Sequence, residues 1–178
     1  MVDLKGQYEG IKDQISSSFE EVITSTAFIN GPEVQNFQKE LEGYLGVKHV
    51  IPCGNGTDAL QIAMMGLGLK PGDEVITADF TFAATVEVIA LLGLTPVLVD
   101  VEPDTFNIDP EKVKAAITPK TKAIVPVHLF GQTANMDEIM DIATANNLFV
   151  IEDKYARRHA GGFIGALLSV GSLGVRRG

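Results

Sequence analysis

A glycine-rich turn, GNGT at residues 54–57, comes directly before a stretch with the apolar spacing of a helix at residues 57–68. Glycine lets backbone N–H groups point outward, and the first turn of a helix adds unpaired donors and a partial positive charge. Such a turn suits a phosphate group. It matches neither the P-loop nor the dinucleotide-binding pattern, so an ordinary turn with Thr57 or Asp58 as the helix cap is the alternative interpretation.

Two more side chains stand where a strand is expected to end. Asp153 closes the apolar run LFVIED, and a carboxylate held there at low dielectric favours a nearby cation such as a protonated ring nitrogen. The ring of Phe82, at the start of a helical stretch, could cover a flat ligand. The structural alternatives are a helix cap or surface ion pair for Asp153 and core packing for Phe82. For His128, near another strand end, a hydrogen-bonded structural role is expected rather than a ligand contact. Cys53 is expected to be buried.

Short apolar runs rich in branched residues alternate with longer helical patterns along most of the chain. Helices are expected at residues 7–25, 32–45, 57–68, 81–93, 109–118 and 135–147, and strands at 49–53, 73–78, 95–101, 122–129 and 148–153. The alternation predicts a parallel sheet of five strands with helices on both faces, because right-handed crossovers return each strand beside a partner. Ligands bind outside the carboxyl ends of such strands, so the turn, Phe82 and Asp153 are expected at one edge.

The composition is that of an ordinary globular domain, with 178 residues, 46% hydrophobic and 21% charged. A single cysteine and the lack of a Cys/His cluster with metal-site spacing indicate neither a disulfide nor a metal centre, and favour the reducing cytoplasm. No apolar run reaches the roughly 20 residues that span a bilayer. The formal charge of -9 argues against nucleic acid as a partner.

The charge is distributed unevenly along the chain. Residues 154–178 carry five basic side chains and no acidic one, so the preceding 153 residues carry a formal charge of -14. The break falls immediately after Asp153. It suggests that the two segments differ in origin or in role.

Four blocks of the sequence together resemble the sugar aminotransferases of the DegT/DnrJ/EryC1/StrS family. They are residues 28–63, 72–109, 116–139 and 149–153. The resemblance implies an α/β fold, namely an incomplete aspartate aminotransferase-like large domain of PLP fold type I. It also implies pyridoxal 5'-phosphate as cofactor and transfer of an amino group from glutamate to a nucleotide-linked keto sugar. The chain is most similar to enzymes acting on UDP-linked 3-keto hexuronates in surface polysaccharide synthesis, which form homodimers with shared active sites.

The same resemblance assigns roles to individual positions. The backbone at Gly56 and Thr57 and the Thr57 hydroxyl would hold the cofactor phosphate, with Asp58 beside them. Phe82 would stack on the pyridine ring, and Asp153 would pair with its nitrogen. Ionised Asp153 would keep that nitrogen protonated, so that the ring can accept electrons.

The segment FINGPEV, residues 28–34, would lie near the sugar, with Ile29 and Asn30 as the candidate substrate contacts. After Asp153 the sequence departs from the family, which continues with a segment resembling AAQ and then a Ser-x-Lys motif. That lysine forms the Schiff base and acts as general acid and base. Ala156 stands here where Gln or His is expected, and no Ser-x-Lys follows. We therefore identify no catalytic residue in this chain.

The resemblance divides the chain into amino-terminal helices at 1–46, a partial PLP-binding large domain at 47–153 and a divergent tail at 154–178, with the small carboxyl-terminal domain absent. An altered reading frame or a truncated gene would explain the tail, and a short variant in which residues 163–175 cap the sheet is the alternative. The function alternatives are a non-catalytic remnant that binds a phosphate ligand or a full-length partner, and a flavodoxin-like binding domain. A family branch with histidine in place of lysine dehydrates sugars, but the surroundings of His159 do not match it.

Overall fold

The computed structural model describes residues 3–154 of the chain, and it divides into two compact units at the junction of Pro52 and Cys53. The first unit contains two helices, α1 (Leu4–Ser25) and α2 (Pro32–Leu45). No residue of either helix is buried. Both helices are thus only partly covered within the described unit.

Local signals explain where both helices begin and end. The Asp3 carboxylate accepts a hydrogen bond from the N–H of Gly6 at 3.0 Å and so caps α1. Pro32 occupies the first turn of α2, where the missing N–H costs nothing. Gly46 ends α2 with φ of 65°, a left-handed conformation that glycine adopts without a steric penalty. The predicted bounds of α2 are confirmed at both ends.

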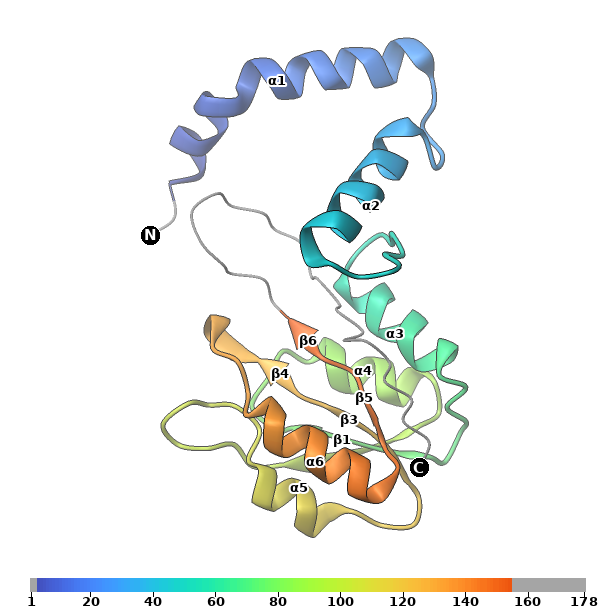
Figure 1. Ribbon diagram of the computed structural model, residues 1–178, viewed down its shortest axis with the longest axis vertical. Coiled ribbons are helices and arrows are strands. Elements are labelled where there is room, and N and C mark those ends of the chain that lie inside the picture. Colours follow the sequence, from blue (N-terminus) through green and yellow to red (C-terminus); the bar gives the residue numbers. More distant parts are fainter. Residues whose placement is uncertain (1–2, 155–178) are drawn as a thin grey trace. The chain divides into compact units, whose positions relative to one another are not determined.

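The second unit is built around a parallel sheet with the strand order β2-β1-β3-β5 (Figure 1). These strands are β1 (Glu74–Ala78), β2 (Thr95–Val99), β3 (Thr121–Val125) and β5 (Phe149–Val150). A short second sheet pairs β4 (Val127–His128) with β6 (Asp153–Lys154), also in parallel. Ile76 at the centre of the main sheet lies in register with Val97 on one side and Ile124 on the other.

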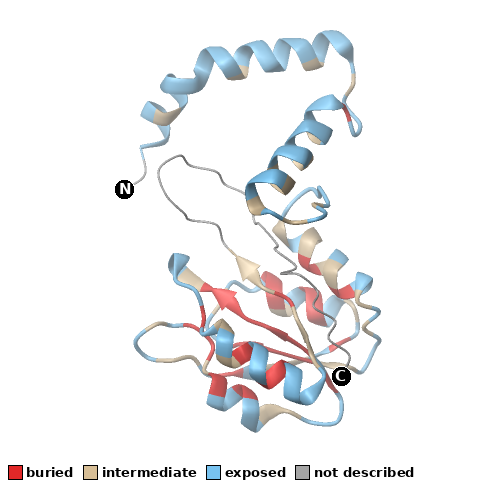
Figure 2. Cartoon of the chain, viewed as in Figure 1, coloured by how far each residue is buried: buried red, intermediate tan, exposed pale blue. Residues whose placement is uncertain are grey.

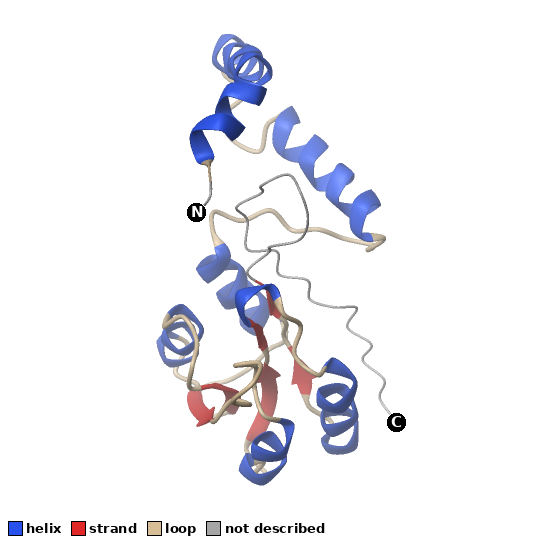
Figure 3. Cartoon of the chain, turned by 90° about the vertical axis from the view of Figure 1, so that its left-hand side faces the viewer, coloured by secondary structure: helices blue, strands red, loops and turns tan. Residues whose placement is uncertain are grey.

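Helices cover both faces of this sheet, as predicted (Figure 3). They are α3 (Gly56–Gly66), α4 (Ala84–Leu91), α5 (Pro110–Ala116) and α6 (Met136–Asn146). Successive strand side chains point to opposite faces. Ile76 and Ile124 thus pack in one core with side chains of α5 and α6. Val75 and Val125 pack in a second core with side chains of α3 and α4. In Figure 2 the buried residues lie in the strands and on the helices of the second unit.

The prediction of five strands is corrected at three places. The run expected as one strand at 148–153 is divided between β5 in the main sheet and β6 in the second sheet. Residues 49–53 form no strand, because Pro52 has no N–H to donate and the described part of the chain offers them no partner strand. Ile51 is 71% exposed and Cys53 is exposed rather than buried. The run expected as one strand at 122–129 is split at Pro126, whose carbonyl still accepts a hydrogen bond from the N–H of Asp153 at 2.9 Å.

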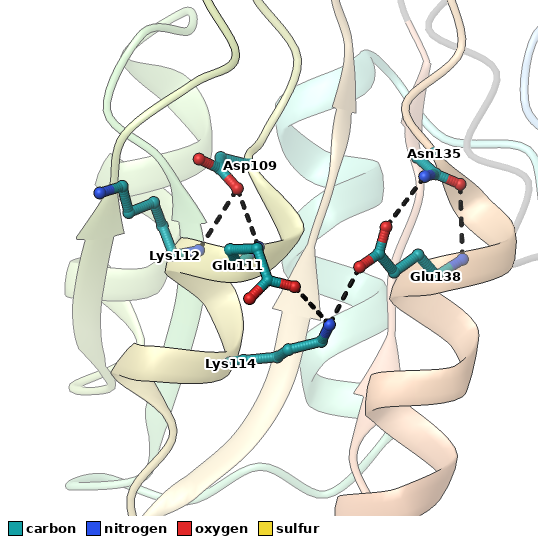
Figure 4. A network of polar contacts seen from close by, with 6 residues as sticks. All are labelled: Asp109, Glu111, Lys112, Lys114, Asn135 and Glu138. Atoms are coloured by element: carbon teal, nitrogen blue, oxygen red, sulfur yellow. Dashed lines mark hydrogen bonds and ion pairs between the residues drawn. The ribbon is translucent and has the colours of Figure 1, made fainter.

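A polar network joins α5 and α6 on the surface (Figure 4). The ammonium of Lys114 lies 3.0 Å from a carboxylate oxygen of Glu138 and also pairs with Glu111. Asp109 and Asn135 cap the two helices at their amino ends.

None of the helices in residues 3–154 combines the length and apolar character that a bilayer crossing requires.

Candidate functional site

The predicted phosphate turn begins a helix, and its geometry differs from the expectation in one respect. Asn55, rather than Thr57 or Asp58, is the cap of α3. Its side-chain oxygen accepts from the N–H of Asp58 at 2.9 Å, and its amide nitrogen donates to the Asp58 carboxylate at 2.9 Å. A local signal for this existed, because asparagine is among the residues preferred at the N-cap.

This capping arrangement leaves backbone donors open at the helix start. The N–H groups of Gly56 and Thr57 have no acceptor among the described residues, whereas that of Asp58 is satisfied by the cap. A β-carbon at Gly54 would approach the Asp58 carboxylate to 3.0 Å. A small residue at position 54 therefore leaves Asp58 undisturbed, and the exposed Thr57 presents its N–H and hydroxyl at the helix amino end.

Replacing Asn55 with alanine is expected to lower the free energy of unfolding by about 1 kcal/mol, because one capping acceptor is lost. Asn55→Ser keeps an acceptor and is expected to lose only a few tenths of that amount. Urea denaturation followed by circular dichroism measures both. Equal stability of Asn55→Ala and the parent chain would contradict the capping role.

Phe82 lies between β1 and α4 and is 78% exposed. The alternative of core packing is therefore wrong for this residue. The neighbouring Thr81 hydroxyl is buried and has no hydrogen-bond partner within the described residues. The segment after β1 thus presents one uncovered ring and one unsatisfied polar atom.

Asp153 lies in β6, half-buried, and accepts a hydrogen bond from the Thr85 hydroxyl at 2.9 Å. Burial raises the pKa of this carboxyl above its ordinary value, whereas the bond from Thr85 and the nearby His128 act to lower it. Within residues 3–154 the Asp153 carboxylate caps no helix and belongs to no ion pair. Both structural alternatives considered for Asp153 are therefore absent from the described contacts.

His128 is buried, and both of its ring nitrogens are engaged. Nδ1 accepts from the backbone N–H of Ala134 at 3.1 Å, so in the neutral ring the proton lies on Nε2, which donates to Glu152 at 3.0 Å. This hydrogen bond, more than the charge of Lys154, holds the pKa of the Glu152 carboxyl below its ordinary value. His128 is a satisfied structural histidine, as the sequence favoured.

The elements that carry these groups share one core. Leu60 of α3, Val88 of α4 and Ile151, two positions before Asp153, belong to the same buried cluster. Helices α3 and α4 also pack side by side (Figure 1). The bond between Thr85 and Asp153 ties the first turn of α4, which directly follows Phe82, to the strand that bears the acid.

Sequence reasoning missed Thr85. It is 1% exposed and lies three positions after Phe82. A threonine in the first turn of a helix commonly serves the backbone of its own helix, and its partner here lies 68 positions away in the sequence. The only signal was indirect, since a carboxylate at a buried strand end needs a hydrogen-bond donor.

The remaining predicted positions belong to the first unit or lie outside the described residues. Ile29 and Asn30 belong to the first unit, between α1 and α2, where Ile29 is 94% exposed and the Asn30 carbonyl accepts from the Gln35 side chain at 3.2 Å. Their predicted contact with a sugar stays a prediction. Ala156, His159 and the rest of the divergent tail lie outside the described residues.

Comparison with known proteins gives a consistent set of matches. The model of the DegT/DnrJ/EryC1/StrS aminotransferase family matches residues 9–170. The chain is 51% identical over 152 residues to UDP-2-acetamido-2-deoxy-3-oxo-D-glucuronate aminotransferase of Pseudomonas aeruginosa, covering 85% of this chain and 42% of that protein. It is 50% identical over 123 residues to GDP-perosamine synthase of Caulobacter vibrioides, covering 69% and 33%.

Solved structures agree. An aminotransferase of this type from Brucella abortus superposes with a TM-score of 0.82 at 46% identity, over 85% of this chain and 43% of that one. NtdA from Bacillus subtilis, solved with bound cofactor PMP, superposes with a TM-score of 0.77 at 44% identity, over 79% and 32%. The predicted fold class is thereby confirmed. The chain spans less than half the length of each of these four relatives.

Proposed function

Because the chain belongs to the DegT/DnrJ/EryC1/StrS aminotransferase family, we propose that it provides the cofactor-binding face of an enzyme that transfers an amino group from glutamate to a nucleotide-linked keto sugar. The proposed cofactor is pyridoxal 5'-phosphate. The 51% identity to the Pseudomonas aeruginosa enzyme supports a UDP-linked 3-keto hexuronate as the sugar and surface polysaccharide synthesis as the setting. A cytoplasmic homodimer is proposed with it.

The single observation that carries this proposal is the half-buried Asp153 carboxylate, with Oδ2 held by Thr85. Three further observations fit the cofactor. The N–H groups of Gly56 and Thr57 are open to a phosphate at a helix amino end, where negative charge is favoured. The ring of Phe82 is uncovered, and Asp58 is held in place beside the turn by Asn55.

Each residue then has a defined task. Pyridoxal 5'-phosphate, when bound, supplies an electron-accepting pyridine ring. Asp153, ionised, holds a proton on the ring nitrogen through a charge-assisted hydrogen bond. The backbone of Gly56 and Thr57 binds the phosphate, and Phe82 packs against the ring face to fix its plane. These contacts would fix the orientation of the ring when the cofactor is bound.

A second candidate function rests on the sequence after Asp153. No Ser-x-Lys motif occurs in residues 154–178, the segment in which the family resemblance predicts the lysine that attaches the cofactor and transfers protons. The candidate is a chain that binds the cofactor reversibly and does not catalyse. We propose with it the division into helices at 1–46, a partial large domain at 47–153 and a divergent tail at 154–178, although the family match continues to residue 170.

Borohydride reduction separates the two candidates. The purified 178-residue chain is incubated with pyridoxal 5'-phosphate, reduced and examined by peptide mass spectrometry. We expect reversible binding without a fixed adduct on a defined lysine, because residues 154–178 contain no Ser-x-Lys motif. An adduct at a single lysine would instead show that this chain carries the attachment residue.

The cofactor contacts are tested by titration with pyridoxamine 5'-phosphate, which needs no lysine. Asp153→Asn is expected to weaken binding about 10-fold to 100-fold, since a charge-assisted hydrogen bond is lost. Asp137→Asn, at an exposed position in the first turn of α6, removes the same charge and is expected to leave the affinity unchanged. Equal affinities for Asp153→Asn and the parent chain would refute the proposed site.

A further inference from the structure

We propose that Thr85 is a positioning residue for Asp153, which fixes the orientation of the carboxylate and keeps it ionised while leaving Oδ1 for a cationic ring nitrogen. This inference rests on the proposed function, because the ring nitrogen belongs to the proposed cofactor. Thr85 itself does not touch the cofactor. It acts through the acid alone.

The geometry of the pair supports a fixed carboxylate. Thr85 is 1% exposed, and its hydroxyl donates to Asp153 Oδ2 at 2.9 Å. Thr85 is flanked on α4 by the buried residues Ala84, Val88 and Ile89. A hydroxyl in such apolar surroundings is costly to leave unpaired, so the bond is expected to persist and to hold one oxygen of the carboxylate in place.

The backbone of the acid is held as firmly as its side chain. The N–H of Asp153 donates to the Pro126 carbonyl at 2.9 Å, and β6 pairs with β4 in parallel. The sheet thus fixes the backbone of Asp153, and Thr85 of α4 fixes the Oδ2 atom of its side chain. Oδ1 is the oxygen for which no donor stands among residues 3–154. The arrangement leaves one acceptor of a defined orientation for a ligand.

The surroundings of Asp153 determine how strongly its ionised form must be stabilised by Thr85. Burial disfavours the ionised form of Asp153, whereas the nearby His128 favours it. The adjacent Glu152 is compensated by Nε2 of His128 at 3.0 Å and the Lys154 ammonium at 3.4 Å. Within the described chain, Thr85 is the side chain that donates directly to Asp153. A donor to a carboxylate favours its ionised form.

A merely structural role is the alternative, in which Thr85 ties α4 to β6 without affecting ionisation. Thr77 offers a matched control for it. Thr77 is also fully buried, in β1, and its hydroxyl donates to the Val125 carbonyl at 2.9 Å. Thr77→Val therefore removes a buried threonine hydrogen bond from the same unit without changing the surroundings of an acid.

The test is the titration of Asp153 in the ligand-free chain, followed by the NMR signal of its carboxyl carbon, with Asp153→Asn to assign the signal. Thr85→Val, which keeps the shape and removes the hydroxyl, is expected to shift the titration midpoint upward. Thr85→Ser is expected to restore it, and Thr77→Val to leave it unchanged. An unshifted midpoint in Thr85→Val, or an equal shift in Thr77→Val, would overturn the inference.

Binding of pyridoxamine 5'-phosphate provides the second readout. Thr85→Val is expected to bind about tenfold more weakly than the parent chain near neutral pH, with the loss growing as the pH falls, because less of Asp153 is ionised there. Thr85→Cys, a weaker donor of similar size, should lie between Thr85→Val and Thr85→Ser and serves if the valine variant does not fold.

The two readouts separate the two hypotheses. If the parent chain does not bind pyridoxamine 5'-phosphate, the proposed function fails, and the carboxyl titration alone still decides whether Thr85 sets the ionisation of Asp153. If the parent chain binds but Thr85→Val binds equally well, the proposed function stands and the role of Thr85 is refuted.

Discussion

Replacing Ile151 with alanine is expected to lower the free energy of unfolding by about 2–5 kcal/mol, the range for truncating a large side chain in a packed core. Ile151 is 0% exposed and packs in the cluster that contains Leu60 of α3 and Val88 of α4. Its N–H also donates to the Ile124 carbonyl at 3.0 Å, just after β5 ends. The truncation therefore leaves a cavity where the helices that carry the candidate site meet the sheet. Urea denaturation measures the loss.

Ile62→Ala is the matched control, because Ile62 lies on the outer side of α3 and is 43% exposed. Its loss is expected to stay below about 1 kcal/mol, as for most surface substitutions. Hydrogen exchange of the amides of β3 reports on the second unit alone. It should show a larger loss of protection in Ile151→Ala than in Ile62→Ala. Similar losses for Ile151→Ala and Ile62→Ala would show that the cluster is not the core of this unit.

The two faces of the sheet could be predicted from the sequence because strand periodicity is a local property. Val75 and Ile76 are adjacent, and they enter different cores, each with its own pair of helices. The bounds of α2 could likewise be predicted from local signals, because Pro32 and Gly46 mark its two ends through backbone conformation alone. Asn55 carried the same kind of signal and was overlooked in favour of Thr57 and Asp58.

Strand existence depends on partners, which a local pattern does not supply. Residues 49–53 have the composition of a strand, yet Pro52 removes one donor and no described strand lies beside them. The run at 122–129 was predicted as one element, and Pro126 divides it between two sheets. In both runs the branched residues indicate a strand, but the proline interrupts the pairing that a single strand requires.

The candidate site shows the same limit. The sequence predicts Gly54, Phe82 and Asp153 because each ends or follows a run expected as a strand, where parallel sheets bind ligands, although residues 49–53 before Gly54 form no strand. Thr85 could not be found in this way, because its importance comes from a partner 68 positions away. The assignment of Gly56, Thr57, Asp58, Phe82 and Asp153 to a cofactor came from the family resemblance, and it stays a prediction.

Asn107 is expected to be the most sensitive polar position of the second unit. It is 2% exposed in the segment between β2 and α5, and its side chain joins this segment to the one after β4. Its amide nitrogen donates to the Thr133 carbonyl at 3.3 Å, and its oxygen accepts from the N–H of Leu129 at 3.3 Å. Both partners are backbone groups, so the amide substitutes for sheet pairing where the strands have ended.

The same segments hold two phenylalanines in unusual conformations. Phe106 and Phe130 have φ of 57° and 53°, a region that bulky residues rarely occupy, and their ring centroids lie 6.4 Å apart. Phe80, after β1, lies 5.5 Å from Phe106 by the same measure. Such strain persists only when the surroundings impose it. We attribute the conformation of Phe130 to Asn107, whose side chain is hydrogen-bonded to the backbone of Leu129 and Thr133 on either side of it.

Asn107→Ala is therefore expected to cost about 2 kcal/mol of unfolding free energy, because two backbone groups lose their partner and an unsatisfied buried group costs about 1–3 kcal/mol. The loops at residues 100–109 and 129–135 should also become more susceptible to limited proteolysis. Asn146→Ala is the control, since among residues 3–154 that side chain is bonded only to the Ile142 carbonyl of its own helix, at 2.8 Å, and Asn146 is exposed. Equal stability of the two variants, with unchanged cleavage of both loops, would show that the loops hold together without Asn107.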